Sequence, residues 1–310
     1  MQFADPKNDL AFKKIFGDKN HKNILISFLN SVLDFKDDMQ IVDVELTNPY
    51  QLPDIKELKE TILDIQAKNK KGESFIVEMQ RKDLGDFEKR SLYYTSKAYV
   101  SQLPKGNDYS VLNKVYFIGI LNFEIFKNKN SISRHLIINQ ETQKQDLKDF
   151  EFTFIELPKF KKELEDLETI LDKWIYFIKE ASNLTMIPTQ YKTEQDFEDA
   201  FNIATQTIWS KKELEVYDYM KLKEFDEINA IRTATRKAAI KAEQKGMEKG
   251  LQKGLQKGME KGIQKGIEQG EKNKAIEIAK KLLKANVDIE TIKISTGLKF
   301  EDIKNLETNL

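Results

Sequence analysis

A four-residue repeat between Lys245 and Gly270 constrains the fold of this chain more than any other feature of its sequence. Its unit is lysine, glycine, an apolar residue and glutamate or glutamine, and glycine recurs at every fourth position from 246 to 270. On an α-helix each unit would advance about 40° beyond a full turn, so the apolar residues would form a stripe that winds slowly around the axis. A partner that followed this stripe would wrap around the helix in a right-handed sense.

Two interpretations of the repeat remain open. Each interior glycine costs a helix about 1 kcal/mol relative to alanine, so the seven glycines favour a flexible linker unless a partner packs against the segment. In the alternative, the segment is a helix through which the protein forms a homodimer or a higher oligomer, and the glycines let two backbones approach closely. The regularly placed lysines exclude a membrane role.

The chain is long enough for more than one core, and the repeat divides it. At 310 residues we expect one large domain with additional segments. The predicted parts are an α/β domain with a helical extension at 1–225, a helical or flexible segment at 226–270, and a small helical tail at 271–310. In the tail, Thr296-Gly297 marks a turn between two short helices, which is typical of a helix-turn-helix. Whether this tail contacts DNA stays open.

Composition narrows the classes of function. The 51 basic and 51 acidic residues balance, so any nucleic-acid surface must be a local patch. The absence of cysteine excludes disulfides, thiolate catalysis and cysteine-type zinc sites, and the two histidines lack companions at ligand spacing. The N-terminus does not resemble a signal peptide, and no apolar run is long enough to span a bilayer. We therefore expect a soluble cytoplasmic protein without a membrane partner.

The first 160 residues predict a compact α/β unit. Asp5 would cap the first helix, Pro6 suits its first position, and Gly17 would end it. The predicted elements in order are helices at 5–17 and 21–33, strands at 41–46, 61–67 and 74–80, a helix at 86–102, and strands at 114–123 and 152–157. The core order is thus helix, three strands, helix, strand. From Lys161 onward helices dominate.

Two carboxylates are expected to face each other across the hairpin formed by 61–67 and 74–80. With a turn centred near Lys71, positions whose numbers sum to about 142 lie opposite each other, which pairs Asp64 with Glu78. Like charges in such a pair are destabilising unless something neutralises them. Magnesium would do so, because it is usually held by one or two carboxylates together with phosphate oxygens. The alternative interpretation is an ordinary solvated sheet face.

Gln80 and a face of the following helix add polar groups to this region. Residues two apart on a strand point the same way, so the Gln80 amide could orient a water or a phosphate oxygen beside Glu78, although it cannot act as a base. On the helix, Arg90, Tyr94 and Lys97 share one face by their spacing. Such a face could bind DNA phosphates, with Tyr94 donating a hydrogen bond or stacking on a base. Tyr93 is predicted to pack in the core.

Four segments resemble the Rpn family of recombination-promoting nucleases and transposases, a branch of the PD-(D/E)XK nuclease superfamily. They are DPKNDLAFKKIFG at 5–17, LDIQAK at 63–68, IVEMQRKD at 76–83 and KRSLYYTSKAYVSQL at 89–103. The repeat and the tail also look like that family, so the resemblance covers nearly the whole chain. It implies a restriction-endonuclease-like core of helix, three strands, helix and strand, in agreement with the order predicted above.

The resemblance also implies chemistry, namely Mg²⁺-dependent hydrolysis of DNA phosphodiesters, with Mn²⁺ able to substitute. Asp64 and Glu78 match the family's metal-binding catalytic acids. Gln80 stands in the catalytic motif where the superfamily usually has a lysine, which leaves the identity of the general base open. Related nucleases often have another acid on the first helix, where Asp9 lies; in the alternative, Asp9 is an exposed residue paired with Lys13 at i+4.

Three classes of function follow from the sequence. The first is a metal-dependent DNA endonuclease that promotes recombination by breaking DNA; no motif of an RNase-H-like transposase is evident. The second is a non-catalytic DNA-binding or assembly protein on the same fold, which the substitution at Gln80 keeps open. The third is a structural partner protein without DNA affinity, which rests on the long helices alone.

Overall fold

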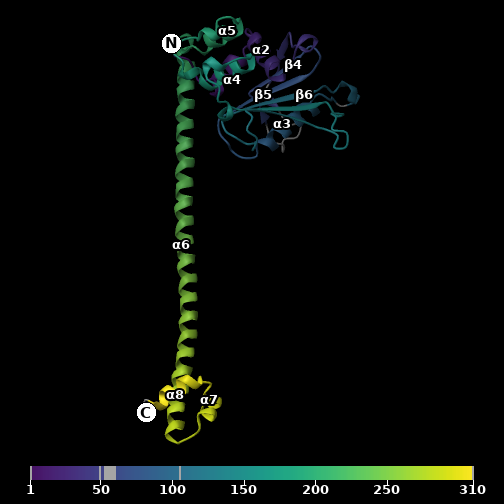
Figure 1. Cartoon of the computed structure of the whole chain (residues 1–310). Coiled ribbons are helices and arrows are strands. Elements are labelled where there is room, and N and C mark those ends of the chain that lie inside the picture. Colours follow the sequence, from purple (N-terminus) through teal and green to yellow (C-terminus); the bar gives the residue numbers. More distant parts are fainter. Residues whose placement is uncertain (1, 49, 52–60, 105, 309–310) are drawn as a thin grey trace. The chain divides into compact units, whose positions relative to one another are not determined.

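The computed structural model describes residues 2–48, 50–51, 61–104 and 106–308. The chain forms two compact units that divide between Phe225 and Asp226. The helix α6 (Lys211–Lys284) begins in the first unit and continues into the second. Figure 1 shows the elements along the chain. The division into three parts that the sequence suggested stays a prediction.

A mixed six-stranded sheet forms the centre of the first unit. Its strands in spatial order are β1 (Val44–Leu46), β4 (Ile65–Asn69), β5 (Ser74–Gln80), β6 (Val115–Leu121), β8 (Phe150–Glu156) and β7 (Ile132–Leu136). The strands β1, β4 and β5 are antiparallel neighbours, β6 and β8 continue in parallel with β5, and β7 closes the edge antiparallel to β8. A separate two-stranded pair joins β2 (Tyr50–Gln51) to β3 (Thr61–Ile62).

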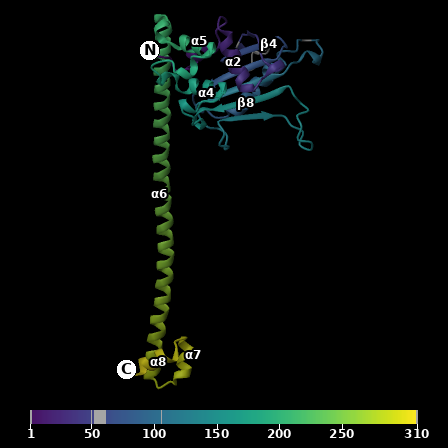
Figure 2. The same ribbon diagram turned by 45° about the horizontal axis from the view of Figure 1, so that its top comes forward.

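Helices cover both faces of this sheet, and Figure 2 shows helices that cover one of them. The bounds of the larger ones are α1 (Asp9–Phe16), α2 (Lys22–Leu33), α3 (Phe87–Val100), α4 (Ile170–Glu180) and α5 (Gln195–Ala204). Buried residues of α1, α2, α4 and α5 share one apolar core with one face of the sheet, whereas α3 packs into a second core on the other face. The order of helix, three strands, helix and strand is confirmed.

Short 3₁₀ helices connect these elements. They are η1 (Asp37–Met39), η2 (Tyr109–Val111), η3 (Leu157–Lys159), η4 (Leu164–Asp166), η5 (Ala181–Asn183), η6 (Thr189–Tyr191) and η7 (Gln206–Ile208).

Strand β6 is buried along its whole length, as its continuous apolar run predicts. Gly119 in this strand pairs with Glu78 of β5. A Cβ atom at this position would lie 3.1 Å from the ring of Phe87 and 3.0 Å from that of Phe154. Glycine therefore lets the first turn of α3 approach the sheet directly beside Glu78.

Some local predictions are wrong. Asn8, not Asp5, caps α1, because its side chain accepts hydrogen bonds from the amides of Leu10 and Ala11. The side chain of Asp5 is instead used in ion pairs. Tyr93 is 41% exposed rather than packed in the core. The buried positions of α3 are Phe87, Ser91, Thr95 and Ala98. The side chains that this helix packs against the sheet are therefore mostly smaller and more polar than the tyrosines that the sequence suggested.

Strand boundaries also differ from the prediction. Val42 is 74% exposed and lies before β1, which begins only at Val44. Pro49, near which the sequence placed the end of this strand, lies outside the described residues. The predicted strand at 61–67 is interrupted at Asp64, between β3 and β4. Strand β7 was not predicted, because its alternation is irregular and its residues are only partly buried.

The second unit consists of a helix and a small helical cluster. The repeat is helical throughout, so the flexible-linker interpretation is wrong. Apart from the adjoining residues and backbone of the helix itself, no atom lies within 4 Å of a Cβ built at any glycine from Gly246 to Gly270. After α6 follow α7 (Ile289–Thr296) and α8 (Phe300–Thr308), which pack with the end of α6 around Ala279, Ile292, Leu298 and Ile303.

The turn between α7 and α8 follows from its sequence. Gly297 ends α7 with a φ of 70°, a left-handed conformation that glycine adopts without strain. Asp288 caps the start of α7 through the amide of Thr291. The helix-turn-helix-like arrangement of the tail is therefore present. In the part of the chain that the structure describes, no helix combines the length and the apolar character needed to cross a bilayer.

Candidate active site

The carboxylates of Asp64 and Glu78 each accept a hydrogen bond from a backbone amide across the hairpin. The amide of Asp64 donates to Glu78 Oε1 at 3.1 Å, and the amide of Met79 donates to Asp64 Oδ2 at 2.9 Å. The ladder from Ile65 opposite Val77 to Lys68 opposite Ser74 has the predicted register, so Asp64 and Glu78 occupy the next opposed positions. The interruption of the strand at Asp64 gives its carboxylate access to the β5 backbone.

Both carboxyl groups are withdrawn from solvent, and this changes their acidity. Glu78 is only 3% exposed. Burial raises the pKa of Asp64 to about 7, with a further contribution from hydrogen bonding to Asp9. Burial together with the negative charge of Asp64 raises the pKa of Glu78 to about 8. Two buried carboxylates that repel each other make a site in which a cation would be strongly favoured.

Lys13 of α1 brings a positive charge to this pair. Its Nζ lies 2.8 Å from Asp9 Oδ1 and 3.4 Å from Asp64 Oδ1. Partial burial acts to lower the pKa of Lys13, but hydrogen bonding to Asp9 and the charge of Asp64 leave this pKa above its ordinary value. The ammonium group therefore joins the acid on the first helix to the acid pair of the sheet.

Gln80 connects the acid pair to α3. Its Nε2 donates to Glu78 Oε2 at 3.1 Å, and its Oε1 accepts a hydrogen bond from Arg90 at 2.9 Å. The Arg90 guanidinium also lies over the ring of Phe87, 5.0 Å from its centroid. The Nε of Arg90 is buried without a hydrogen-bond partner among the described residues. Arg90 thus fixes the orientation of the Gln80 amide, and Gln80 in turn binds Glu78.

The remaining residues of the predicted DNA-binding face lie farther along α3. Tyr94 is half-buried, and burial together with the charge of Glu78 raises the pKa of its hydroxyl group. Tyr94 is therefore close to the acid pair, as Arg90 is. Lys97 follows one helical turn later. The structure thus brings Arg90 and Tyr94 to the site, and the role of Lys97 stays a prediction.

Arg81 anchors the end of β5 directly after Gln80. Its guanidinium group forms ion pairs with Asp5 at 3.1 Å and with Glu224 at 2.7 Å. Glu224 belongs to the part of α6 that lies in the first unit, where Tyr217 also accepts a hydrogen bond from the amide of Asp5. The strand that carries Glu78 and Gln80 is thereby tied to the N-terminal segment and to the start of α6.

The donor set suits a hard divalent cation. All the acidic donors are oxygens, and the two principal acids, buried Glu78 and partly buried Asp64, lie side by side. The match is incomplete, because no three acidic, histidine or cysteine side chains among the described residues are grouped as a metal site. Asp9 is the third acid in the region, and Lys13 bridges it to Asp64.

The sequence prediction did not assign Lys13 to the site. Its spacing from Asp9 indicated only a pair on the surface of one helix. The contact with Asp64 joins residues 51 positions apart in the sequence and arises because α1 packs beside the sheet. A lysine four residues after a candidate acid was the only available signal. The role of Arg81 in anchoring β5 was also not predicted.

A mixed sheet covered by helices, with an acid pair at the hairpin before α3, defines an α/β domain of the PD-(D/E)XK nuclease class. The particular family is the PD-(D/E)XK nuclease family transposase, whose model matches residues 6–234, and the chain belongs to it. The match includes Asp9, Lys13 and all the site residues from Asp64 to Lys97, and it ends within α6, before the repeat. It supports a nuclease-like role. No curated protein and no solved structure matched the chain.

Without metal, the free energy of unfolding should decrease as the pH rises from about 4 to about 8. The folded state keeps Asp64 and Glu78 protonated at pH values where the unfolded chain has released these protons. The stabilisation is complete below the ordinary pKa values and is lost as the pH rises through the raised ones. Each extra proton held by the folded state contributes about 1.4 kcal/mol per pH unit.

Urea unfolding in EDTA at several pH values measures this dependence. The variant Glu78→Gln should show a flatter decrease than the wild type, because one of the two groups no longer titrates. Equal slopes for the two proteins would contradict the assignment of the raised pKa values to this pair.

Proposed function

We propose that this protein is a Mg²⁺-dependent DNA endonuclease that hydrolyses phosphodiester bonds and promotes recombination through the resulting breaks. Mn²⁺ substitutes for Mg²⁺, and the cytoplasm is the proposed location. The observation that carries the proposal is the acid pair of buried Glu78 and partly buried Asp64, in which each carboxylate accepts a backbone amide hydrogen bond from across the hairpin. Membership of a nuclease family supports the same conclusion.

In this proposal Asp64 and Glu78 hold the cation, and Asp9 is the additional acid. A bound Mg²⁺ would polarise a phosphate oxygen and lower the pKa of a water molecule. Gln80 holds Glu78 in place through its amide and presents no group that could accept a proton at neutral pH. Arg90 keeps this amide oriented, so a residue of α3 positions a metal-binding acid of β5.

Lys13 acts as a positioning residue. Its ammonium group holds the carboxylates of Asp9 and Asp64 near each other before a cation binds. A cation held by Asp64 would compete with Lys13 for that carboxylate. The ammonium group of Lys13 would then be available near the acid pair to attract the DNA backbone, together with Tyr94 and Lys97 of α3.

A non-catalytic DNA-binding or assembly protein on the same fold is the second candidate function. Gln80 favours this function, because its side chain carries no charge and its amide group is hydrogen-bonded to both Arg90 and Glu78. In this case Lys13 would neutralise Asp64 permanently, and the domain would bind DNA without cutting it.

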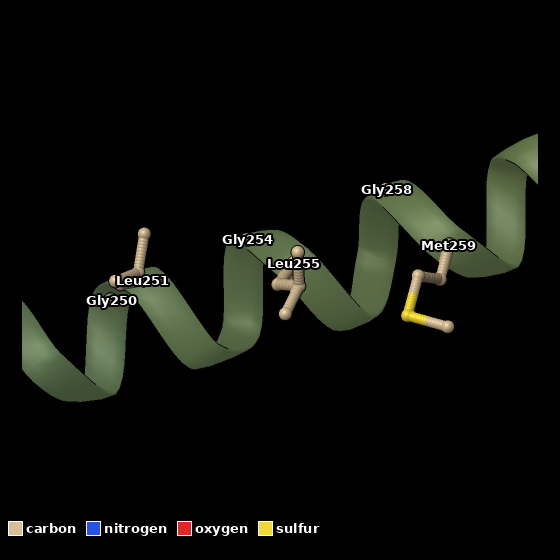
Figure 3. Close-up of a pocket in the computed structure, with 6 residues that line it drawn as sticks. All are labelled: Gly250, Leu251, Gly254, Leu255, Gly258 and Met259. Carbon is tan, nitrogen blue, oxygen red and sulfur yellow. The ribbon is translucent and has the colours of Figure 1, made fainter.

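The repeat in α6 is proposed to mediate self-association. Its apolar side chains are well exposed, from 80% at Met247 to 57% at Ile267. Figure 3 shows Leu251, Leu255 and Met259 turning progressively around the helix, with Gly250, Gly254 and Gly258 beside them. A second copy of the same repeat would bring an apolar stripe with the same winding, and glycine would allow close approach of the two backbones.

Cutting of supercoiled plasmid DNA tests the nuclease proposal. The wild type should nick or linearise the plasmid with Mg²⁺ or Mn²⁺ and should be inactive in EDTA. Asp64→Ala and Glu78→Ala should lose activity by at least about a hundredfold, because the cation can no longer be held. Circular dichroism checks that the variants are folded. A folded wild type that binds DNA but does not cut it with either metal would support the second candidate instead.

Substitution of Lys13 separates positioning from folding. Lys13→Met should bind Mn²⁺ more tightly than the wild type in calorimetry, since the competing ammonium group is absent. It should nevertheless cut DNA about ten- to a hundredfold more slowly at saturating metal, because misplaced groups lose rate of this order. Lys13→Arg should restore part of the rate. Unchanged metal affinity together with unchanged cutting would show that Lys13 has no role in the site.

Self-association is tested by the triple variant Gly250→Ala, Gly254→Ala and Gly258→Ala. Alanine should stabilise the helix by about 1 kcal/mol at each position, and the helix content should remain high. The added methyl groups should nevertheless weaken the dimer or oligomer in sedimentation equilibrium, because they separate the two backbones. A wild type that remains monomeric at high concentration would refute the proposal.

A further inference from the structure

A row of lysines winds around α6 on the side opposite to its apolar stripe. Eight lysines recur at every fourth position, and all are exposed: Lys237, Lys241, Lys245, Lys249, Lys253, Lys257, Lys261 and Lys265. Those from Lys245 to Lys265 each lie two residues before an apolar residue of the stripe, which places them about 160° from the stripe around the helix. We call this set the lysine row. Pairing of two copies through the stripe would leave the row facing outward.

The lysine row concentrates positive charge, although the chain as a whole has no net charge. Between Lys237 and Lys265 the eight lysines are accompanied by three glutamates, a net charge of +5, while the whole chain balances 51 against 51. Among the residues that the structure describes, none of the eight forms an ion pair. The row is therefore a local basic surface of the kind that a neutral protein needs for binding nucleic acid.

We propose that the lysine row binds the phosphate backbone of duplex DNA independently of sequence. Neighbouring lysines of the row are about 6 Å apart along the helix, and the whole row is about 42 Å long. Duplex DNA presents one negative charge per about 1.7 Å of its axis. Each lysine that faces the duplex thus meets a phosphate at any register. The choice of DNA as the polyanion rests on the proposed nuclease function.

The winding of the row limits how many lysines face one duplex. Successive lysines are rotated by about 40°, so about four of them fall within one arc of about 120° around the helix. The same winding makes a membrane a poor partner, although lysines opposite an apolar stripe occur in helices that lie on membranes. From Met247 to Ile267 the stripe turns through about 200°, and a straight helix cannot turn such a stripe toward one flat bilayer.

The experiment measures DNA binding separately from cutting. All proteins are full-length, carry Glu78→Ala and are studied in EDTA, so the duplex stays intact. Fluorescence anisotropy with a labelled 40-base-pair duplex gives Kd over a range of salt concentrations. The row variant replaces five lysines with glutamine at 245, 249, 253, 257 and 261. The control makes the same change in net charge at five other exposed lysines of α6, at 212, 223, 272, 274 and 280.

The row variant should bind the duplex more than about tenfold more weakly at 0.1 M salt, and the slope of log Kd against log salt should fall by about 2 to 4. The control should change the slope by less than about 1. Circular dichroism should show unchanged helix content in both. An unchanged slope for the row variant, or an equal loss in the control, would overturn the proposal.

A second experiment tests membrane binding with vesicles of phosphatidylcholine and phosphatidylserine at a ratio of 3:1. Co-sedimentation should detect no binding that depends on the row. Row-dependent binding to these vesicles without row-dependent binding to DNA would also overturn the proposal. Because every protein carries Glu78→Ala, this experiment does not depend on plasmid cutting. DNA binding through the lysine row can be present even if the wild type does not cut DNA. It can also be absent even if the wild type is an active nuclease.

Discussion

The two hydrogen bonds that the carboxylates of Asp64 and Glu78 accept across the hairpin set the geometry on which the rest of the site depends. Glu78 accepts from the amide of Asp64 and Asp64 accepts from the amide of Met79, at the point where the ladder between β4 and β5 ends. Side chains thus continue the pairing that the backbone no longer makes. The acids are buried because the strands around them are apolar, and the same burial that raises their pKa values makes a bound cation favourable.

Two helices reach this pair from opposite faces of the sheet. Lys13 extends from α1, which packs in one apolar core, and Arg90 acts through Gln80 from α3, which packs in the other. Each of the two helices therefore brings one positively charged side chain to the site. A change in the packing of either face would move one side of the site, so stability and function of this domain depend on the same contacts.

The sequence predicted the parts of the fold that local patterns control. The register of the hairpin, and with it the pairing of Asp64 and Glu78, followed from alternation and turn position. The burial of Tyr93 was predicted wrongly because α3 packs other residues against the sheet, and the cap at Asp5 was predicted wrongly because Asn8 makes the capping hydrogen bonds. Lys13 could not be assigned, since its contact with Asp64 depends on how α1 packs. The helix propensity of glycine, taken alone, favoured a flexible linker, whereas the repeat is helical.

The period of four in α6 gives the second unit an adjustable length. Every repeat contains the same kinds of residue in the same order, so the gain or loss of one repeat leaves the lysine row and the apolar stripe continuous. Such a change would alter the helix by about 6 Å and rotate everything after it by about 40°. Nine added repeats would restore the original direction of α7 and α8. A change in the number of repeats can thus alter the length of α6 and the direction of the helices that follow it, while the lysine row and the apolar stripe are kept.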